Sequence, residues 1–261
     1  MKNPETRRTL RWTALVSIVL FVGLSNTMDY FTYPETITVI SNRYYTLFTP
    51  DGYTFSIWGL IYLSWVFYGV YQLLPGERDV EAYDYLSVPV IISSVLGIVW
   101  GIVYRLDRIA ASLVVIILML VVAIILFIRV RRAVLRKGYS NWLSLPFSLY
   151  AGWLTVATIA NAAVYLEATG FDGAGISEVN RTLGMVVLAT IIGLVTGFIY
   201  RDFIFPATIA WGITGIAVAN KDVDAFLMYV CFACAAICAV AALTLVNIYF
   251  NYRKRYVPAI T

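Results

Sequence analysis

Four aromatic side chains share one face of a predicted helix that follows a short turn. Phe55, Trp58, Tyr62 and Trp65 recur three or four residues apart, a spacing that aligns them along one side of an α-helix. The turn at residues 50–52, Pro-Asp-Gly, comes directly before them. A transmembrane helix can be built from aliphatic residues alone. The presence of four rings on one face therefore needs another explanation. Rings gathered on one face can stack on a flat apolar molecule, and this face is therefore a candidate binding surface.

A second face of this kind occurs in the apolar segment 143–166. Residues recur there every three or four positions, namely Pro146, Tyr150, Trp153, Ala157 and Asn161. The small side chain of Ala157 leaves room beside the Trp153 indole. An amide left unpaired away from water costs about 1–3 kcal/mol, so Asn161 is the expected polar contact of a ligand.

A third ring, Trp100, lies between two glycines. Gly97 and Gly101 leave space that the Trp100 ring can enter, and glycines at this spacing also favour close helix packing. Tryptophan is enriched at membrane interfaces, but Trp58, Trp100 and Trp153 each lie two or three turns inside their segments. These rings favour a pocket, and packing of each ring in the protein core is the alternative.

The composition determines the class of protein that must position these residues. Of 261 residues, 61% are hydrophobic and 13% are charged, with a mean hydropathy of +0.81; soluble domains carry about 25% charged residues. Only Arg201 and Asp202 separate the sixth and seventh apolar segments. Eight segments meet or approach the roughly 20 residues that span a bilayer, namely 12–31, 54–74, 86–104, 109–128, 143–166, 182–200, 203–220 and 226–250. We therefore predict an all-α polytopic membrane helix bundle.

Residues able to perform catalysis or bind a metal are scarce. The chain has no histidine, and it contains no nucleophile–base pair and no phosphate-binding glycine loop. Cys231, Cys234 and Cys238 share one helical stripe; packing as small apolar residues is favoured over a soft-metal site. We predict no catalytic residue, no metal and no covalent cofactor, and we do not favour an enzyme. The net charge of +4 does not indicate nucleic acid.

Two polar residues lie near the outer end of the first segment. Asp29 is the one plausible intramembrane charge, and such a charge indicates function by default. Its alternatives are an interfacial position or a hydrogen bond into the following loop. Asn26 lies one turn earlier, and both residues are candidate polar contacts of a ligand.

The connection 32–53 is long, aromatic and poor in charge. A solvated linker would be richer in Ser, Gly and charge. We expect this segment to be packed as a lid on the bundle, with a plain connecting loop as the alternative.

The stretch "LFTPDGYTFSIWGLIYL" resembles the signature of the TspO/MBR family, the tryptophan-rich sensory proteins related to the mitochondrial translocator protein. The family has an F-T-P-P-G-W loop that runs into a helix beginning near F-x-x-x-W-x-x-L-Y. Asp51 replaces the second proline of that loop, and Tyr53 replaces its tryptophan. The residues that match are Phe48, Thr49, Pro50, Gly52, Trp58 and Tyr62.

The other family positions give partial matches. Trp100 matches the tryptophan of the third helix, although Gly97 stands where the family has asparagine. Trp153, Ala157 and Asn161 match the W-x-x-x-A-x-x-x-N pattern of the fifth helix. The resemblance covers about residues 10–166.

The resemblance implies a particular domain organisation. Residues 1–166 would form a TspO-like five-helix core with the 32–53 lid loop. Residues 167–261 would add three transmembrane helices and a basic tail. We expect those helices to pack on the core or to join protomers, and not to form the ligand site.

The resemblance also implies a function. We expect a membrane receptor or carrier that binds a porphyrin, another tetrapyrrole, a sterol or a lipid beneath the first extracytoplasmic loop. The alternatives are a transporter of such a ligand and an enzyme acting on a bound porphyrin. The expected partners are membrane lipid, a small apolar ligand and a second copy in a homodimer, in a bacterial or archaeal plasma membrane. The expected ligand contacts are Phe48, Pro50, Tyr53, Trp58, Tyr62, Trp100, Tyr150, Trp153, Ala157 and Asn161.

The distribution of basic residues predicts that both termini face the cytoplasm. With eight crossings, 14 of the 19 Lys and Arg residues fall on that side, as the positive-inside rule requires. Cysteine tags at each end should therefore resist a membrane-impermeant reagent in intact cells. Labelling of the C-terminal tag from outside would contradict the eight-crossing arrangement.

Overall fold

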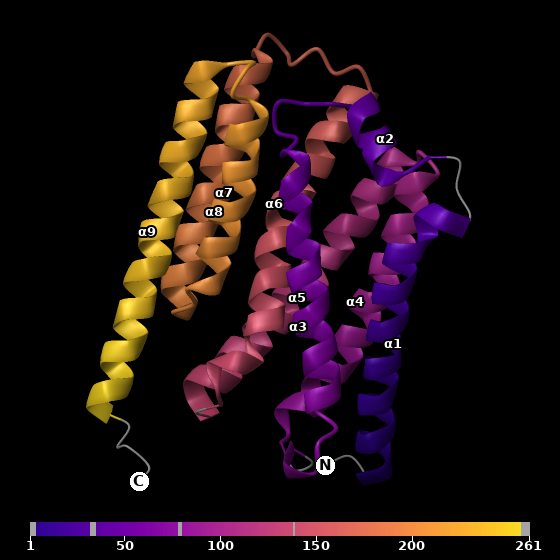
Figure 1. Ribbon diagram of the computed structural model, residues 1–261, viewed down its shortest axis with the longest axis vertical. Helices are drawn as coiled ribbons and strands as arrows, with labels where there is room; N and C mark the ends of the chain where they lie inside the picture. The colour runs from indigo at the N-terminus through magenta and orange to yellow at the C-terminus, as the bar shows by residue number, and fades with distance from the viewer. Residues whose placement is uncertain (1–3, 32–34, 78–79, 138, 257–261) are drawn as a thin grey trace. The chain divides into compact units, whose positions relative to one another are not determined.

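The computed structural model describes residues 4–31, 35–77, 80–137 and 139–256. The described part of the chain is 84% helical and contains no strand. Short elements join the long helices: α2 (Ile37–Arg43), η1 (Gly52–Ser56), η2 (Pro75–Glu77) and η3 (Asn141–Leu143). The long helices are α1 (Pro4–Phe31), α3 (Ile57–Tyr71), α4 (Ala82–Arg105), α5 (Ile109–Lys137), α6 (Leu145–Ala168), α7 (Glu178–Tyr200), α8 (Ile204–Ala219) and α9 (Ala225–Tyr256) (Figure 1).

Each of the eight predicted segments forms a helix, which confirms the predicted polytopic all-α fold. Seven helices in the described part are long and apolar enough to cross a membrane. The remaining one, α8, has 16 residues and a length of about 24 Å. It is thus shorter than the roughly 30 Å of a typical hydrocarbon core.

The division between α7 and α8 is made by two residues. Arg201 ends α7 in the left-handed conformation, with φ of 50°. Asp202 is buried, and its Oδ1 accepts a hydrogen bond of 2.8 Å from the backbone N–H of Phe205. This carboxylate satisfies an otherwise unpaired N–H at the start of α8. Arg201 and Asp202 therefore form the turn that ends α7 and begins α8.

The chain forms two compact units. The first comprises Met1–Thr46 and Phe55–Asp172, and the second comprises Leu47–Thr54 and Gly173–Thr261. The predicted division placed all of 32–53 with the N-terminal core. In the structure, residues 47–54 of that segment group instead with the three C-terminal helices.

Within the first unit, α1 packs against α3 and α4, and α5 packs against α4 and α6. Helix α3 also contacts α6, and the short α2 contacts α4 (Figure 1). Within the second unit, α7, α8 and α9 pack against one another.

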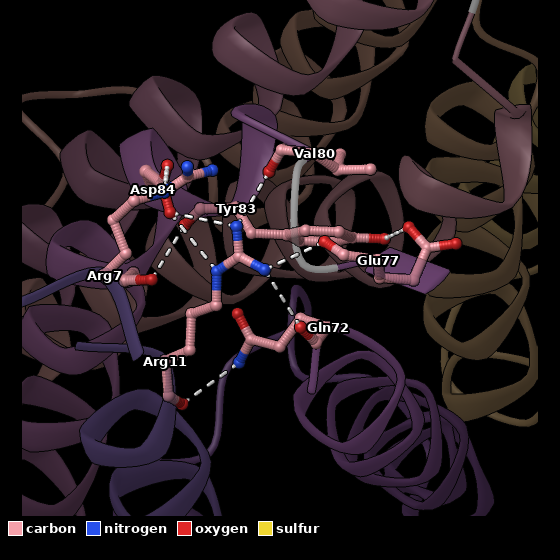
Figure 2. Close-up of polar contacts among 8 residues, drawn as sticks. Arg7, Arg11, Gln72, Glu77, Val80, Tyr83 and Asp84 are labelled. Carbon is pink, nitrogen blue, oxygen red and sulfur yellow. Dashed lines mark hydrogen bonds and ion pairs between the residues drawn. The ribbon is translucent and has the colours of Figure 1, made fainter. Parts of the chain in front are cut away.

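A buried arginine joins α1 to the connection between α3 and α4. Arg11 is only 4% exposed. Its Nε and Nη2 donate to Asp84 Oδ1 at 3.2 and 3.0 Å. Nη1 donates to the carbonyls of Gln72 and Glu77 at 3.2 and 2.9 Å, and Nη2 also donates to the carbonyl of Val80 at 2.9 Å (Figure 2). An arginine has five N–H donors, so these bonds satisfy the buried cation completely.

Neighbouring side chains extend this network. Arg7 Nε pairs with Asp84 Oδ2 at 2.7 Å, and the Arg11 guanidinium lies 5.2 Å from the centre of the Tyr83 ring. The Tyr83 hydroxyl donates to Glu77 Oε2 at 3.0 Å (Figure 2). Asp84 is thus the counter-ion of both Arg7 and Arg11 at the basic start of α1.

Replacing Arg11 should destabilise the first unit. Arg11→Met leaves three carbonyls without their donor and Asp84 with Arg7 as its remaining partner. Removing one partner of a buried ion pair costs about 3–5 kcal/mol. Thermal unfolding in mild detergent should show a clear drop in midpoint. Arg8→Met, on the exposed face of the same helix, is the matched control and should change the midpoint little. Equal midpoints for the two variants would contradict the structural role of Arg11.

Candidate ligand-binding site

The predicted aromatic faces of α3 and α6 meet in the first unit. Trp58, Tyr62 and Trp65 lie along α3, and Tyr150 and Trp153 lie along α6. Because helical residues three or four positions apart share a face, each helix contributes one row of rings. Phe55 of η1 and Phe21 of α1 contact these rows. We call the whole set the aromatic cluster: Phe21, Phe55, Trp58, Tyr62, Trp65, Tyr150 and Trp153.

Trp58 lies at the centre of the aromatic cluster. Its ring stacks on Tyr62 with centroids 5.3 Å apart and an interplanar angle of 27°. It meets both Tyr150 and Trp153 edge-on, in each case with centroids 6.3 Å apart. Phe55 meets Trp153 edge-on at 5.8 Å. Such pairs contribute about 0.5–1.5 kcal/mol each beyond the area they bury, so the cluster also stabilises the helix packing.

The rings differ in how far they are covered. Trp65, Tyr150 and Trp153 are buried, whereas Trp58 and Tyr62 are half-buried and Phe55 is 39% exposed. Phe55, Trp58 and Tyr62 are therefore the rings of the cluster that keep exposed surface.

Phe21 is a member of the cluster that the sequence analysis missed. Its ring contacts Trp58, Tyr62 and Trp65, with centroids 6.4, 5.5 and 6.2 Å away. It lies against Gly97, where an added Cβ would come within 2.3 Å of Phe21 Cε2. We expected Trp100 to use the space beside Gly97, but Phe21 fills it. The available signal was the helical spacing of the apolar residues Ala14, Ile18 and Phe21. The structure buries all three.

One polar atom of the cluster is unsatisfied. Trp153 is 1% exposed, and its Nε1 has no hydrogen-bond partner among the described residues. By contrast, Trp65 Nε1 donates to the Pro146 carbonyl at 3.3 Å, and the Tyr150 hydroxyl accepts from Ser93 at 3.1 Å. A buried donor without an acceptor costs about 1–3 kcal/mol. Trp153 Nε1 therefore keeps an unused hydrogen-bond donor among the described residues.

A family model described as TSPO-like protein matches residues 8–244. The chain belongs to the TSPO-like protein family. The match confirms the resemblance to the TspO/MBR family, and it extends past residue 166 into α9. A search of curated proteins and a search of solved structures each found no match. Membership of the TSPO-like family, together with the apolar helices, makes the chain an integral membrane protein and indicates ligand binding or transport in general terms.

Two further predicted contacts of this TSPO-like protein pair with each other. Trp100 Nε1 donates to Asn161 Oδ1 at 3.4 Å, and Asn161 Nδ2 donates to the carbonyl of Ala157 at 3.0 Å. Trp100 also stacks on Tyr104 with centroids 5.1 Å apart. The Asn161 amide is thus engaged within the protein, whereas Trp153 Nε1 is not. Ala157 is half-buried.

Helix α2 covers the Trp100 end of the first unit. Ile40 of α2 is buried in a core with Tyr104, and Trp100 packs against this core. Arg43 Nη1 pairs with Asp107 Oδ2 at 2.8 Å, and the Tyr44 hydroxyl donates to the same oxygen at 3.2 Å. This part of the predicted lid therefore lies on the end of α4 and the turn that follows it.

The loop residues predicted as contacts lie in the second unit. Phe48 and Pro50 are buried. Tyr53 is 41% exposed and meets Trp211 of α8 edge-on, with centroids 5.5 Å apart. The structure thus groups Phe48, Pro50 and Tyr53 with α7–α9. The sequence offered no sign of this grouping.

The remaining predicted residues have simpler surroundings. Asn26 is exposed, and its Nδ2 donates to the carbonyl of Val22 at 2.7 Å in its own helix. The side chain of Asp29 lies outside the described residues. Cys231, Cys234 and Cys238 are free and buried on α9. No group of three or more metal-binding side chains occurs among the described residues.

Filling the space beside Gly97 should disturb the cluster. Gly97→Ala forces the Phe21 ring to move, and overpacking of this kind costs about 1–3 kcal/mol. Thermal unfolding should shift to lower temperature, and the near-UV circular dichroism of the rings should change. Gly23→Ala on α1 is the matched control, because an added Cβ there meets nothing within 4 Å. If both variants behave alike, Phe21 does not depend on the missing side chain of Gly97.

Proposed function

We propose that the chain is a membrane receptor or carrier whose aromatic cluster binds a planar apolar ligand, with tetrapyrroles and sterols or other lipids as the leading classes. The observation that carries the proposal is the unpaired Nε1 of Trp153, buried among rings. A protein optimised only for packing would satisfy this donor or replace the indole with a ring that has none.

The proposed binding mode follows from the exposed rings. Phe55, Trp58 and Tyr62 offer partly open surface to a flat ligand, and offset or edge contacts on such rings are favourable. A carbonyl or carboxylate on the ligand would accept from Trp153 Nε1 after the Phe55 ring moves aside, since Phe55 meets the Trp153 indole edge-on. Apolar stacking combined with one acceptor describes both a porphyrin and an oxygenated lipid. The partners required are membrane lipid and one small ligand.

Replacing Trp153 should weaken binding. Trp153→Ala removes one buried ring of the aromatic cluster together with its Nε1–H donor. The dissociation constant of the ligand should therefore rise on the order of tenfold or more. Trp153→Phe keeps a ring and should cause a smaller loss. The measurements are protoporphyrin IX titration followed by the pigment's own absorbance, and binding of labelled cholesterol. Trp142→Phe, at a residue 75% exposed, is the control and should bind like the wild type.

The same preparations separate the alternatives. Saturable binding without flux in proteoliposomes favours a receptor or carrier. Flux that depends on the ligand favours a transporter, and a new absorbing product that needs light or oxygen favours an enzyme. If Trp153→Ala folds normally and binds both probes like the wild type, the ligand site is not the aromatic cluster.

A further inference from the structure

One row of exposed side chains runs along the side of α1 in the first unit. Its members follow one another every four residues, and residues with this spacing form a gently inclined ridge on a helix. All five are exposed, and the four apolar members keep between 39% and 52% of their surface. We call this set the α1 row: Arg8, Trp12, Val16, Leu20 and Leu24.

A groove lies at the beginning of the α1 row. It has a volume of about 510 Å³, it is open to its surroundings, and residues of α1 line it. The lining residues are Arg8, Thr9, Trp12, Thr13 and Val16. The two threonine hydroxyls each donate at 2.9 Å to a backbone carbonyl one turn earlier in the helix. The donors that remain for a ligand in this groove are therefore the Arg8 guanidinium and the Trp12 indole N–H.

The Arg8 charge has no counter-ion among the described residues. Arg7 and Arg11, its neighbours on the helix, both pair with Asp84. The start of α1 thus directs two arginines toward α4 and leaves one at the groove. A guanidinium whose donors are unused matches the oxygens of a phosphate group, which it can bind through two parallel hydrogen bonds.

The order of side chains along the α1 row matches the order of groups in a phospholipid. A cation comes first, an indole follows about 6 Å further along the helix axis, and aliphatic side chains continue for about another 18 Å. One leaflet of a bilayer contributes about 15 Å of hydrocarbon, which is half of a core of about 30 Å. Tryptophan is enriched at the boundary between headgroups and acyl chains. The row is therefore long enough to follow one lipid from its headgroup to the end of its leaflet.

We propose that the α1 row binds one anionic phospholipid. The phosphodiester lies on Arg8, the ester groups lie beside Trp12, and one acyl chain follows the three aliphatic side chains. An anionic headgroup is selected because Arg8 brings a positive charge that no acid balances, whereas a zwitterionic headgroup carries a cation of its own. The site shares no residue with the aromatic cluster, and the inference goes beyond the function proposed above.

Three variants test the site in the full-length protein, purified in mild detergent. Arg8→Gln removes the charge. Arg8→Lys keeps the charge but loses the planar fork that holds two phosphate oxygens at once. Trp12→Leu removes the indole and keeps an apolar side chain. Both positions are exposed, so these variants should fold like the wild type.

The matched control is Arg132→Gln on α5. It removes the same charge from an exposed position at the same end of the first unit. Arg129, three residues earlier, shows this placement: its Nη1 donates at 2.6 Å to the carbonyl of Tyr85, which directly follows Asp84. Because Asp84 pairs with α1, an effect of net charge alone should be equal in Arg8→Gln and Arg132→Gln.

The first measurement is the midpoint of thermal unfolding during titration with dioleoyl-phosphatidylglycerol. A ligand that binds the folded state raises this midpoint as its concentration passes the dissociation constant. The dissociation constant should rise about tenfold or more in Arg8→Gln and by less in Arg8→Lys and Trp12→Leu. It should stay within about twofold of the wild-type value in Arg132→Gln. Dioleoyl-phosphatidylcholine should bind the wild type about tenfold more weakly than the anionic lipid.

Inorganic phosphate separates a lipid site from a plain anion site. At the concentration at which phosphatidylglycerol saturates the wild type, phosphate should leave the midpoint unchanged, because it makes no contact with the aliphatic part of the row. A phosphate effect as large as that of the lipid would overturn the proposal. So would equal weakening in Arg8→Gln and Arg132→Gln, equal affinity for the two lipids, or no shift of the wild type with phosphatidylglycerol.

The second measurement is native mass spectrometry, which counts the lipids that stay bound when the detergent is removed. With phosphatidylglycerol present, the wild type and Arg132→Gln should each retain one lipid more than Arg8→Gln. The same number of retained lipids in all three proteins would contradict a defined site at Arg8.

Discussion

The contact between the Phe21 ring and the backbone of α4 at Gly97 holds the first unit in its form. Because Gly97 has no side chain, the ring of α1 reaches α4 and still faces the rings of α3. Trp58 then packs between Phe21 and the row of rings on α6. One missing Cβ therefore allows three helices to share a single set of ring contacts. The aromatic cluster therefore depends on the close contact between α1 and α4 as well as on its own rings.

Polar groups are satisfied to different degrees in two parts of the first unit. At the start of α1, the five donors of Arg11 all find acceptors, two of them at Asp84 and three at backbone carbonyls. A buried cation is tolerated only under such conditions. Among the rings, by contrast, the indole N–H of Trp153 has no partner in the described residues. The first arrangement joins helices, and the second leaves one buried indole donor unpaired.

The segment that carries the family signature links the two units along the chain. Its proline turn is anchored on α8 within the second unit, and the helix that follows supplies the rings of the first. The family match also continues beyond the first five long helices into α9. The family match therefore includes α7, α8 and most of α9. Within the second unit, the Gly215 carbonyl of α8 accepts a hydrogen bond of 3.1 Å from Asp51 N.

Sequence alone determined the helices and the faces that carry rings, because hydropathy and helical spacing depend only on neighbouring residues. It placed Trp58 with Tyr62 and Trp153 with Ala157, and it separated α7 from α8 at Arg201 and Asp202. Tertiary structure decided which surfaces meet: Phe21 fills the space that Gly97 leaves, Asn161 pairs with Trp100, and Thr54 lies on Gly215. These contacts join residues tens to more than a hundred positions apart. Periodicity within a single helix carries no information about which distant residues meet. Whether a donor such as an indole N–H is satisfied depends on the partner that tertiary packing places beside it.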